Sequence, residues 1–322
     1  MTAEADIWVL LDDRAGNRAQ ALGVVERLGA AFREVDIRYT AMARLPNALL
    51  GASVAGLDAA SKAMLAAPWP KLVIAAGRRT APVARWIGKQ SGGRAKLVQI
   101  MDPGSGDAAF DLICRPAHDT GRTSADNVMT IAAAPHRFNA DAFDKARAQW
   151  QAEVADLPEP RVALLIGGAT RRRAFTPAMG RQIAQAARSA AATLGGSLMV
   201  TTSRRTGDAV DAIRSELKGP HAFYRWDQGG KNPYPGYLAL ADAVIVTGES
   251  VSMCSEAVAV GKPVYIAAPA GLISEKHARL HAALCSGGYA RMFEGAVDLD
   301  WTPAPLDTAQ EIADAICERG MI

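Results

Sequence analysis

Short apolar runs alternate with amphipathic stretches along this chain. In the first half the predicted strands are Ile7–Leu11, Val35–Tyr39 (in which apolar and polar residues alternate), Leu72–Ala76, Leu97–Ile100, Leu112–Cys114 and Val128–Ile131. Between the first two of these, apolar residues recur at helical spacing from Gln20 to Phe32. Short strands that alternate with amphipathic helices are typical of βαβ units and a parallel sheet. We therefore predict an α/β fold.

The alternation pauses at the proline-containing segment Asp156–Pro160 and then begins again. The strands predicted after it are Val162–Ile166, Ser197–Thr201, His221–Trp226, Ala243–Thr247 and Pro263–Ala267. The helices predicted there are Pro177–Leu194, Asp208–Leu217, Val251–Val260 and Thr308–Arg319. We expect two Rossmann-like domains, residues 1–157 and 158–322, with the last helix a candidate to pack back on the first domain.

Composition narrows the class of protein. Hydrophobic residues make up 49% of the 322 residues and charged residues 21%, the balance of a globular protein. There is no apolar run long enough for a membrane span, and residues 1–6 lack the basic residues of a leader peptide. The four cysteines form neither a CxxC motif nor a Cys/His cluster. We therefore expect a cytoplasmic protein with no metal site, and a net charge of +3 gives no reason to expect nucleic acid as a partner.

One stretch is strongly basic. Between Asp58 and Asp102 the chain has no acid and eight bases, which are Lys62, Lys71, Arg78, Arg79, Arg85, Lys89, Arg94 and Lys96. A solvated basic face explains this stretch. So does peripheral docking on an anionic inner leaflet, where each base near the surface contributes about 1 kcal/mol. Charge alone leaves both interpretations open.

Two loops that follow predicted strands in the second half combine hydroxyls with arginines. In open parallel sheets ligands bind beyond the carboxyl ends of the strands, where N–H groups and helix dipoles favour anions. The first loop contains Gly167, Gly168, Thr170, Arg171 and Arg173, and the second contains Thr202, Ser203, Arg204 and Arg205. Glycines allow close backbone approach, and guanidinium groups neutralise a diphosphate. The alternative for each loop is a plain turn with solvated arginines.

A third such loop carries the most information. It comprises Gly248, Glu249, Ser250, Val251, Ser252 and Met253, and it leads into a predicted helix bearing Glu256. Gly248 permits a tight turn, and Ser250 or Ser252 is a candidate cap whose N–H groups would meet an anion. Glu256 is four residues after Ser252 and so shares its helix face, where a carboxylate can accept hydrogen bonds from a ribose. A surface glutamate near a helix start is the alternative.

Several motifs together resemble a known family. The whole chain is similar to the family of the plant elongated-mitochondria fission protein and its bacterial relatives. The resemblance rests on residues 12–17 (DDRAGN), 77–82 (GRRTAP), 115–119 (RPAHD), 167–170 (GGAT), 232–234 (NPY) and 247–250 (TGES). Residues 157–300 also resemble the nucleotide-sugar domain of GT-B glycosyltransferases, with Gly167-Gly168 and Ser250 to Glu256 in the positions of its phosphate and ribose motifs.

The resemblance implies two lobes that face a cleft and a metal-independent transfer of sugar to a lipid or glycan acceptor. A nucleoside diphosphate sugar would be the substrate, with no further cofactor. It places Glu256 on the ribose, Trp226 and Asn232 near the base, and Gly16, Asn17, Gly77 and Arg78 in the acceptor-side lobe. Asp13 is then a candidate general base, with helix capping as its alternative.

Two further assignments concern acid–base and metal chemistry. His118 and Asp119 form a second candidate acid–base pair, with an uninvolved loop histidine as the alternative. Asp12 and Asp13 are not expected to bind a metal, because adjacent carboxylates point to opposite sides of an extended chain.

Other classes of function fit the same fold. An epimerase or hydrolase would turn over the sugar nucleotide without an acceptor, and a non-catalytic adaptor would use the basic stretch 59–101 to dock on a membrane. A nicotinamide oxidoreductase is disfavoured, because no GxGxxG follows a predicted strand. The oligomeric state is left open.

Overall fold

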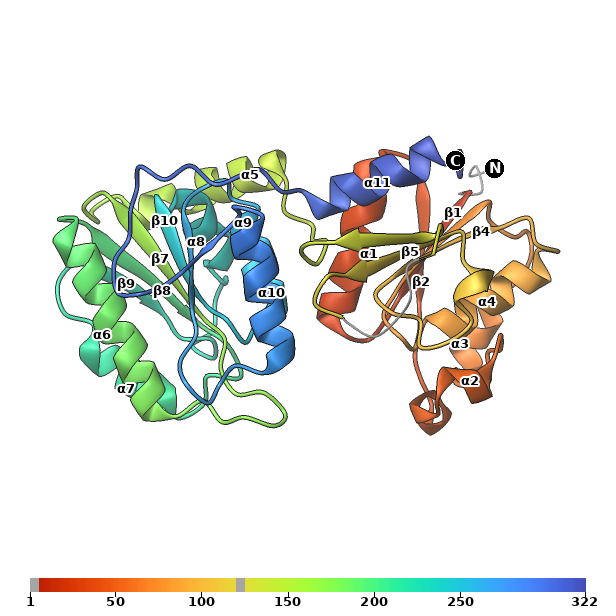
Figure 1. Ribbon diagram of the computed structural model, residues 1–322, viewed down its shortest axis with the longest axis horizontal. Helices are drawn as coiled ribbons and strands as arrows, with labels where there is room; N and C mark the ends of the chain where they lie inside the picture. Colours follow the sequence, from red (N-terminus) through yellow and green to blue (C-terminus); the bar gives the residue numbers. More distant parts are fainter. Residues whose placement is uncertain (1–5, 120–124) are drawn as a thin grey trace. The chain divides into compact units, whose positions relative to one another are not determined.

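The computed structural model describes residues 6–119 and 125–322. Residues 1–5, on which the expectation about a leader peptide mainly rested, lie outside this part of the chain. Contacts separate the chain into two compact units. Unit 1 comprises residues up to Arg137 together with Asp307–Ile322, and unit 2 comprises Phe138–Leu306. Each unit is a parallel sheet covered by helices (Figure 1).

Unit 1 contains a six-stranded sheet in the order β2-β1-β3-β4-β5-β6. Its strands are β1 (Ile7–Leu11), β2 (Phe32–Asp36), β3 (Leu72–Ala76), β4 (Lys96–Ile100), β5 (Leu112–Pro116) and β6 (Val128–Ile131), all paired in parallel. Its helices are α1 (Ala15–Leu28), α2 (Asn47–Leu50), α3 (Ala59–Ala63), α4 (Ala81–Gln90) and α11 (Thr308–Glu318). Short 3₁₀ turns lie at Ala41–Arg44 and Asp107–Ala109.

The period-two alternation of β1 builds the core of unit 1 on both faces of the sheet. Ile7, Val9 and Leu11 pack with α1 and α11 on one face. Trp8 and Leu10 pack with α4 on the other face. All five side chains are buried, because a parallel strand in the middle of a sheet is covered on both sides.

Unit 2 repeats this architecture in the order β12-β11-β10-β7-β8-β9. Its strands are β7 (Arg161–Ile166), β8 (Ser197–Thr202), β9 (His221–Tyr224), β10 (Ala243–Thr247), β11 (Val264–Ala267) and β12 (Arg291–Met292), again paired in parallel. Its helices are α5 (Ala140–Trp150), α6 (Pro177–Thr193), α7 (Ala209–Glu216), α8 (Tyr234–Leu240), α9 (Val251–Val258) and α10 (Glu275–Ser286), with a 3₁₀ turn at Gln151–Val154.

The first helix differs from the one expected between Gln20 and Phe32. It begins earlier, at Ala15, and ends at Leu28, because Gly29 adopts the left-handed conformation (φ 64°) that closes a helix. Phe32, expected to be the last apolar position of the helix, is instead the first residue of β2. The sequence-based strand Val35–Tyr39 was therefore placed too late.

The contacts also divide the chain differently from the expected boundary at residue 157. Helix α5 lies in unit 2, where Trp150 packs so closely on Gly236 of α8 that a Cβ there would overlap the indole. Arg147 also donates to the Ala239 carbonyl, at 3.1 Å. At the other end, α11 returns to unit 1, where Ile312 and Ile316 join its core.

Candidate functional site

The strand order of unit 2 creates a switch point at its carboxyl edge. From β7 the chain continues to β8 on one side and later reaches β10 on the other. Open α/β sheets usually bind their ligands at such a point. Gly167 and Gly168 follow β7, and Gly248 to Ser250 follow β10.

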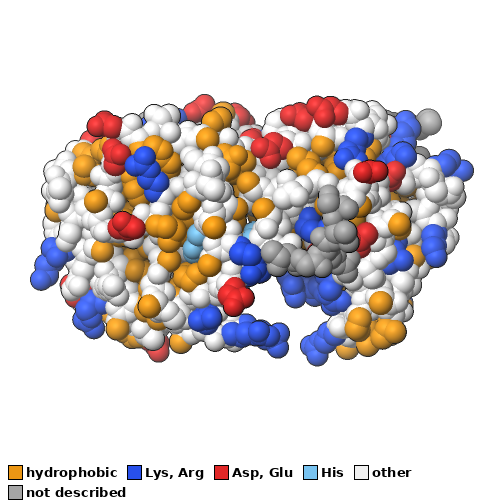
Figure 2. All heavy atoms as spheres, viewed as in Figure 1, with side chains coloured by type: hydrophobic (Ala, Val, Ile, Leu, Met, Phe, Trp, Pro, Cys, Tyr) orange, Lys and Arg blue, Asp and Glu red, His pale blue; other side chains and the backbone are white. Residues whose placement is uncertain are grey.

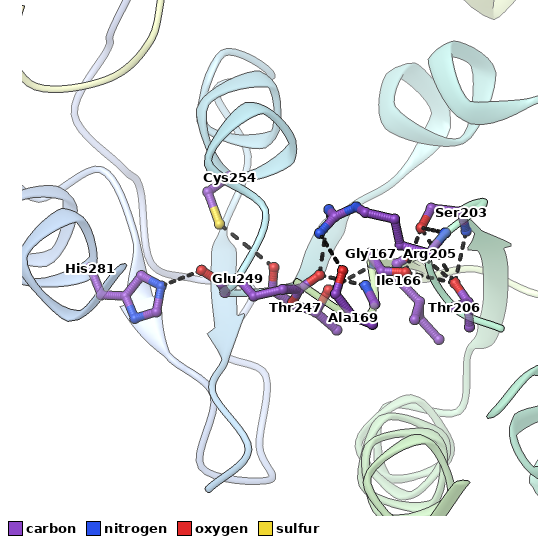
Figure 3. A network of polar contacts seen from close by, with 12 residues as sticks. Ile166, Gly167, Ala169, Ser203, Arg205, Thr206, Thr247, Glu249, Cys254 and His281 are labelled. Atoms are coloured by element: carbon purple, nitrogen blue, oxygen red, sulfur yellow. Dashed lines mark hydrogen bonds and ion pairs between the residues drawn. The ribbon is translucent and has the colours of Figure 1, made fainter. Parts of the chain in front are cut away.

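A network of polar contacts ties these two loops together (Figure 3). The Gly168 N–H donates to Glu249 Oε1 at 2.5 Å, and the Gly167 N–H donates to Thr247 Oγ1 at 2.8 Å. The Gly167 carbonyl accepts from Ser203 and Thr206, at 2.5 and 2.6 Å. The backbone after β7 is thus held from both sides.

This packing explains both glycines without a ligand. A Cβ on Gly167 would overlap the Glu249 carboxylate, and a Cβ on Gly168 would overlap the Arg205 carbonyl. Gly168 also has a φ of 145°, which L-residues rarely adopt. The glycines predicted to let a phosphate approach the backbone therefore already bring the chain's own groups close together.

Glu249 is the buried charge at this edge. It is 3% exposed, and burial raises the pKa of its carboxyl. Arg205 Nη2 lies 3.7 Å from Oε1. Among the described residues Oε2 has no hydrogen-bond partner. This buried carboxylate oxygen can therefore accept a hydrogen bond from a donor group of a ligand.

The loop after β8 lies beside the glycines, as predicted. Arg205 donates from Nη1 to the Ala169 carbonyl at 3.1 Å, and its own N–H donates to Ser203 Oγ at 3.1 Å. Thr202 Oγ1 accepts from the Trp226 N–H at 3.0 Å. Arg204 is exposed. Of the two arginines in the loop after β8, Arg205 thus joins the network and Arg204 does not.

Helix α9 begins beyond this corner. Ser250 is its N-cap, and the Ser250 side chain makes no capping hydrogen bond. Ser252 is exposed in the first turn, with Val251 and Met253 half-buried beside it. An uncapped helix start keeps its first N–H groups available to an anion.

Glu256, on the same helix, is half-buried and accepts a hydrogen bond from the Tyr234 hydroxyl at 2.5 Å. Burial raises the pKa of Glu256 to about 7, although the Tyr234 hydrogen bond opposes the shift. The carboxyl therefore changes charge near neutral pH. The neighbouring Asn232 is exposed, and its Oδ1 accepts a hydrogen bond from the Tyr234 N–H at 3.0 Å. Trp226 is 48% exposed.

Helix α10 closes another side of the edge. His281 contacts the Gly248 carbonyl through Nε2 at 2.7 Å. One turn earlier, His277 and Ser274 form a capping box. Burial lowers the pKa of His277, and His281, Lys276, Arg205 and Arg173 lower it further. The start of α10 is thus capped internally and lies in a positive field.

A cavity of about 770 Å³ lies between the start of α10 and the loop after β7. Its size falls within the range of about 300–1,000 Å³ that is usual for small-molecule sites. Arg173 crosses from one wall to the other, since its Nη1 donates to the Gly271 carbonyl at 2.9 Å. The charged and polar residues of the lining are Thr170, Arg171, Arg172, Arg173, Ser274, Glu275, Lys276, His277 and Arg279.

Unit 1 has a corresponding switch point between β1 and β3, and acidic residues fill it. Asp12 is 2% exposed and accepts from Arg79 Nη2 at 2.5 Å, and Asp13 is in an ion pair with the same guanidinium. Burial and the contact with Asp13 raise the pKa of Asp12, whereas contacts with Asp12 and Arg79 lower the pKa of Asp13. The expectation that the two carboxylates point to opposite sides was wrong, because β1 ends at Leu11 and the chain turns there.

The other residues predicted in unit 1 are also engaged internally. Asn17 donates to Asp12 Oδ2 at 3.0 Å and packs against Gly77, whose φ is 86°. Gly16 lies in the first turn of α1. Arg78 donates to the Leu45 and Ala43 carbonyls at 2.7 and 3.0 Å. These residues hold the edge of the sheet together.

His118 and Asp119 follow β5 (Leu112–Pro116) and lie next to residues 120–124, which are outside the described part of the chain. His118 is 2% exposed. Within residues 6–119 and 125–322, no group of three or more His, Cys, Asp or Glu side chains is arranged to hold a metal ion. None of the helices in these ranges is long and apolar enough to cross a membrane.

Most bases of the stretch 59–101 make ion pairs or hydrogen bonds with other groups of unit 1. Lys71 pairs with Asp6 at 2.8 Å and Lys96 pairs with Asp111 at 3.0 Å. Arg78 and Arg79 make the contacts given above, and Arg85 donates to the Ser105 carbonyl at 3.5 Å. The exposed bases that remain are Lys62, Lys89 and Arg94. The stretch is therefore not the uniform basic face that its sequence indicates.

Comparisons with known proteins support the family resemblance. Residues 15–320 match the model of the mitochondrial fission ELM1 family. The chain is 31% identical over 292 residues to mitochondrial fission protein ELM1 of Arabidopsis thaliana, covering 83% of this chain and 68% of that protein. It is 28% identical to an uncharacterized protein of Rickettsia prowazekii, covering 97% of both chains.

Solved structures confirm the α/β fold of GT-B type. A UDP-GlcNAc 2-epimerase from Neisseria meningitidis, bound to UDP-GlcNAc, aligns with a TM-score of 0.55 at 10% identity over 97% of this chain and 98% of that one. The glycosyltransferase SnogD from Streptomyces nogalater aligns with a TM-score of 0.51 at 13% identity over 98% and 92%. At such identities the likeness concerns the fold alone.

The sequence did not indicate several residues at the two sheet edges. In unit 2, Thr247 and Thr206 hold the glycine corner, and His277 and His281 come from α10. In unit 1, Arg79 neutralises Asp12 and Asp13. The four-residue spacing of the two histidines was the available signal, because it places both on one face of a helix.

Proposed function

This chain belongs to the mitochondrial fission ELM1 family, and on that premise we propose that unit 2 binds a nucleoside diphosphate sugar at the switch point between β7 and β10. The proposed activity is metal-independent transfer of the sugar to a lipid or glycan acceptor. The sugar nucleotide is the substrate, and no further cofactor is proposed.

The uncapped start of α9 carries this proposal. Its N-cap, Ser250, makes no side-chain capping hydrogen bond, while the Gly168 corner and Arg205 follow β7 and β8 of the same sheet. A helix start with available N–H groups beside a guanidinium suits a diphosphate, whose departure in the reaction needs neutralising groups. By contrast, α10 caps its own start.

The remaining parts of the nucleotide have candidate partners on the same edge. Glu256 lies in the second turn of α9, where its carboxylate would accept hydrogen bonds from the ribose. Trp226 is 48% exposed in the loop after β9 and offers a face on which a base could stack. Both roles belong to the proposal.

Calorimetric titration with UDP, ADP and GDP at pH 8, where Glu256 is mostly ionised, tests the proposal. We expect one diphosphate to bind, and Glu256→Ala to weaken binding about tenfold or more, as for a charge-assisted hydrogen bond. Glu318→Ala, an exposed position on α11, is the control and should bind normally. If none of the diphosphates binds, the proposal is wrong.

An epimerase or a hydrolase on the same fold is the alternative reaction. Either would convert the sugar nucleotide in the absence of any acceptor. Incubating the protein with radiolabelled sugar nucleotide and separating the products distinguishes the three reactions. Product that appears without an acceptor would exclude a simple transferase.

A second candidate function, docking on an anionic membrane, is favoured by an exposed apolar tip in unit 1. Met42, Leu45 and Leu49 are 48%, 41% and 74% exposed, and hydrophobic side chains gather over α2 in Figure 2. Arg44 is exposed among them, and the chain has no acid from Ile37 to Leu57. Apolar side chains flanked by a base suit the interface of an anionic bilayer.

Co-sedimentation with vesicles tests this docking. We expect binding to vesicles that contain phosphatidylglycerol, weaker binding as salt rises, and a large loss in Leu45→Ser/Leu49→Ser. Met292→Ser, an exposed apolar position in unit 2, is the matched control. Equal binding by both variants would rule out the tip as the docking element.

A further inference from the structure

We infer that the ligand of unit 2 carries an additional anionic group beyond the diphosphate, a carboxylate or a phosphate, and that the cavity beside α10 binds it. This inference rests on the proposed function and specifies the class of its substrate. The group could belong to the donor, as in a sugar acid, or to a phosphorylated acceptor. The chemistry recognised is the same in both cases.

The charge of the cavity is the first observation. Five cationic side chains line it, Arg171, Arg172, Arg173, Lys276 and Arg279, against one carboxylate, Glu275. Figure 2 shows Lys and Arg side chains gathered at the lower edge of unit 2, over this region. In the proposed arrangement Arg205 and the start of α9 already neutralise the diphosphate. The five cations of the cavity are therefore more than a diphosphate alone requires.

The cavity is also shaped rather than a loose collection of surface arginines. Arg173 bridges its two walls through the Gly271 carbonyl at 2.9 Å. The loop after β7 is fixed in turn, since the Thr170 N–H donates to the Arg173 carbonyl at 2.9 Å. Side chains on a fixed loop lose less entropy when they bind an anion.

The capping box at the start of α10 distinguishes this cavity from a site in which the helix N-terminus alone binds an anion. Ser274 and His277 satisfy each other's backbone N–H groups, and the positive charge of the cavity comes from its Lys and Arg side chains. Burial lowers the pKa of His277, and the positive field of Lys276, Arg205 and Arg173 lowers it further, together with His281. An anion in the cavity would cancel part of that field and raise the pKa of His277 again.

The cavity therefore adjoins the switch point without coinciding with it. Thr170 lines the cavity, and the preceding residue Ala169 accepts from Arg205 at 3.1 Å. A ligand that places its diphosphate at α9 would reach the cavity with whatever lies beyond the diphosphate. For a sugar nucleotide that is the sugar or the incoming acceptor.

Calorimetry with UDP, UDP-glucose and UDP-glucuronate at 0.15 M salt tests the inference, followed by inorganic phosphate added to the UDP-saturated protein. If the donor carries the additional anionic group, the affinity for UDP-glucuronate should be at least about ten times that for UDP-glucose. If a phosphorylated acceptor carries the group instead, inorganic phosphate should bind to the UDP complex in place of the acceptor's phosphate. In either case Arg171→Ala/Arg172→Ala should remove the gain, whereas Lys89→Ala/Arg94→Ala, with the same loss of charge on unit 1, should not.

The outcomes separate this inference from the proposed function. If UDP binds but neither glucuronate nor phosphate adds affinity, the inference fails and the proposed function stands. If Arg171→Ala/Arg172→Ala weakens UDP itself as much as UDP-glucuronate, the cavity is the diphosphate site and the inference is again wrong.

A nucleotide-independent readout covers the remaining case. Proton NMR of the His277 ring in the free protein should show that its pKa rises when phosphate is added. In Arg171→Ala/Arg172→Ala the pKa of His277 should not respond to phosphate. If none of UDP, ADP and GDP binds while this response persists, the proposed function fails and the anion site remains. If the His277 pKa does not respond to phosphate, the cavity does not bind anions.

Discussion

The two units place polar groups at equivalent switch points but treat the charge there differently. In unit 1, Asp12 and Asp13 are neutralised by Arg79, and Asn17 and the Arg14 N–H fill the remaining acceptor positions of Asp12. In unit 2, Glu249 keeps one oxygen without a partner among the described residues, and a cationic cavity lies nearby. The unit 1 edge is satisfied from within, whereas the unit 2 edge keeps an acceptor oxygen on Glu249 that is free among the described residues and has cationic side chains in the cavity beside it.

This difference bears on catalysis. Asp13 was the candidate general base, yet contacts with Asp12 and Arg79 lower its pKa, which makes it a weaker base. Asp12 has a raised pKa but is buried and fully engaged. In the resting structure neither carboxylate is poised to take a proton from an acceptor. Any such role requires Arg79 to move or to be displaced by substrate.

The largest effect should come from the glycine corner of unit 2. We expect Gly168→Ala to lower the free energy of unfolding by about 3 kcal/mol or more, because its φ is 145° and a Cβ would overlap the Arg205 backbone. Urea denaturation measures this loss. Gly195→Ala is the control, with a φ of 70° and open space around it, and should cost only about 1 kcal/mol.

The same substitution in unit 1 sharpens the comparison. Gly77 also has a positive φ of 86°, but a Cβ there would meet the end of the Asn17 side chain rather than backbone, and that side chain can move aside by giving up its hydrogen bond to Asp12. Gly77→Ala should therefore cost less than Gly168→Ala. Equal losses at the two sites would show that the unit 2 corner is no more tightly packed than its counterpart.

A somewhat smaller loss should follow from breaking the unit 1 ion pairs. Arg79→Ala leaves the buried Asp12 without its cation, and we expect a loss of about 3 kcal/mol in unfolding free energy. Asp12→Asn introduced into that variant should recover part of it, since the neutral side chain needs no counter-charge. A double-mutant cycle with Asp12→Asn alone measures the coupling, and additive losses would contradict the pairing.

The fold could be predicted from the sequence to a large extent, and the site only in part. Alternating apolar runs such as Ile7–Leu11 and Ala243–Thr247 are the observed strands, because local pattern decides burial in a parallel sheet. The family resemblance was confirmed as well. The loops after β7, β8 and β10 do lie along one edge, since parallel strands end on the same side.

Failures arose where a tertiary contact overrides local pattern. The side to which α5 belongs depends on Trp150 packing against Gly236, far along the chain. The partners of the predicted ligand residues, such as Glu249 for Gly168 and Asn47 for Arg78, are likewise remote in sequence. A motif indicates that a residue is special, but it does not distinguish a ligand contact from an internal one.

A moderate effect should appear in the pH dependence of unit 2. Burial raises the pKa of Glu256 from about 4.5 to about 7, so the native state binds this proton more tightly than the unfolded chain does. Stability should therefore fall as pH rises from about 4.5 to 7, by on the order of 2 kcal/mol. Urea unfolding at pH 5 and pH 8 should show this difference in the native protein and a reduced one in Glu256→Gln. Glu318→Gln is the control, and an unchanged pH dependence in Glu256→Gln would refute the assignment.

The smallest expected effect concerns Arg78, which the sequence assigned to substrate. Its guanidinium bonds the Ala43 and Leu45 carbonyls and Asn47 Oδ1 at the margin of unit 1, where water can replace some of these contacts. We expect Arg78→Ala to cost about 1 kcal/mol in unfolding free energy and to leave nucleotide affinity unchanged. Vesicle binding should weaken as well, because Arg78 holds the segment that presents Leu45 and Leu49. A variant that loses nucleotide binding while keeping its stability and vesicle binding would instead place Arg78 in the substrate site, and the contrast between a self-satisfied unit 1 edge and a receptive unit 2 edge would no longer hold.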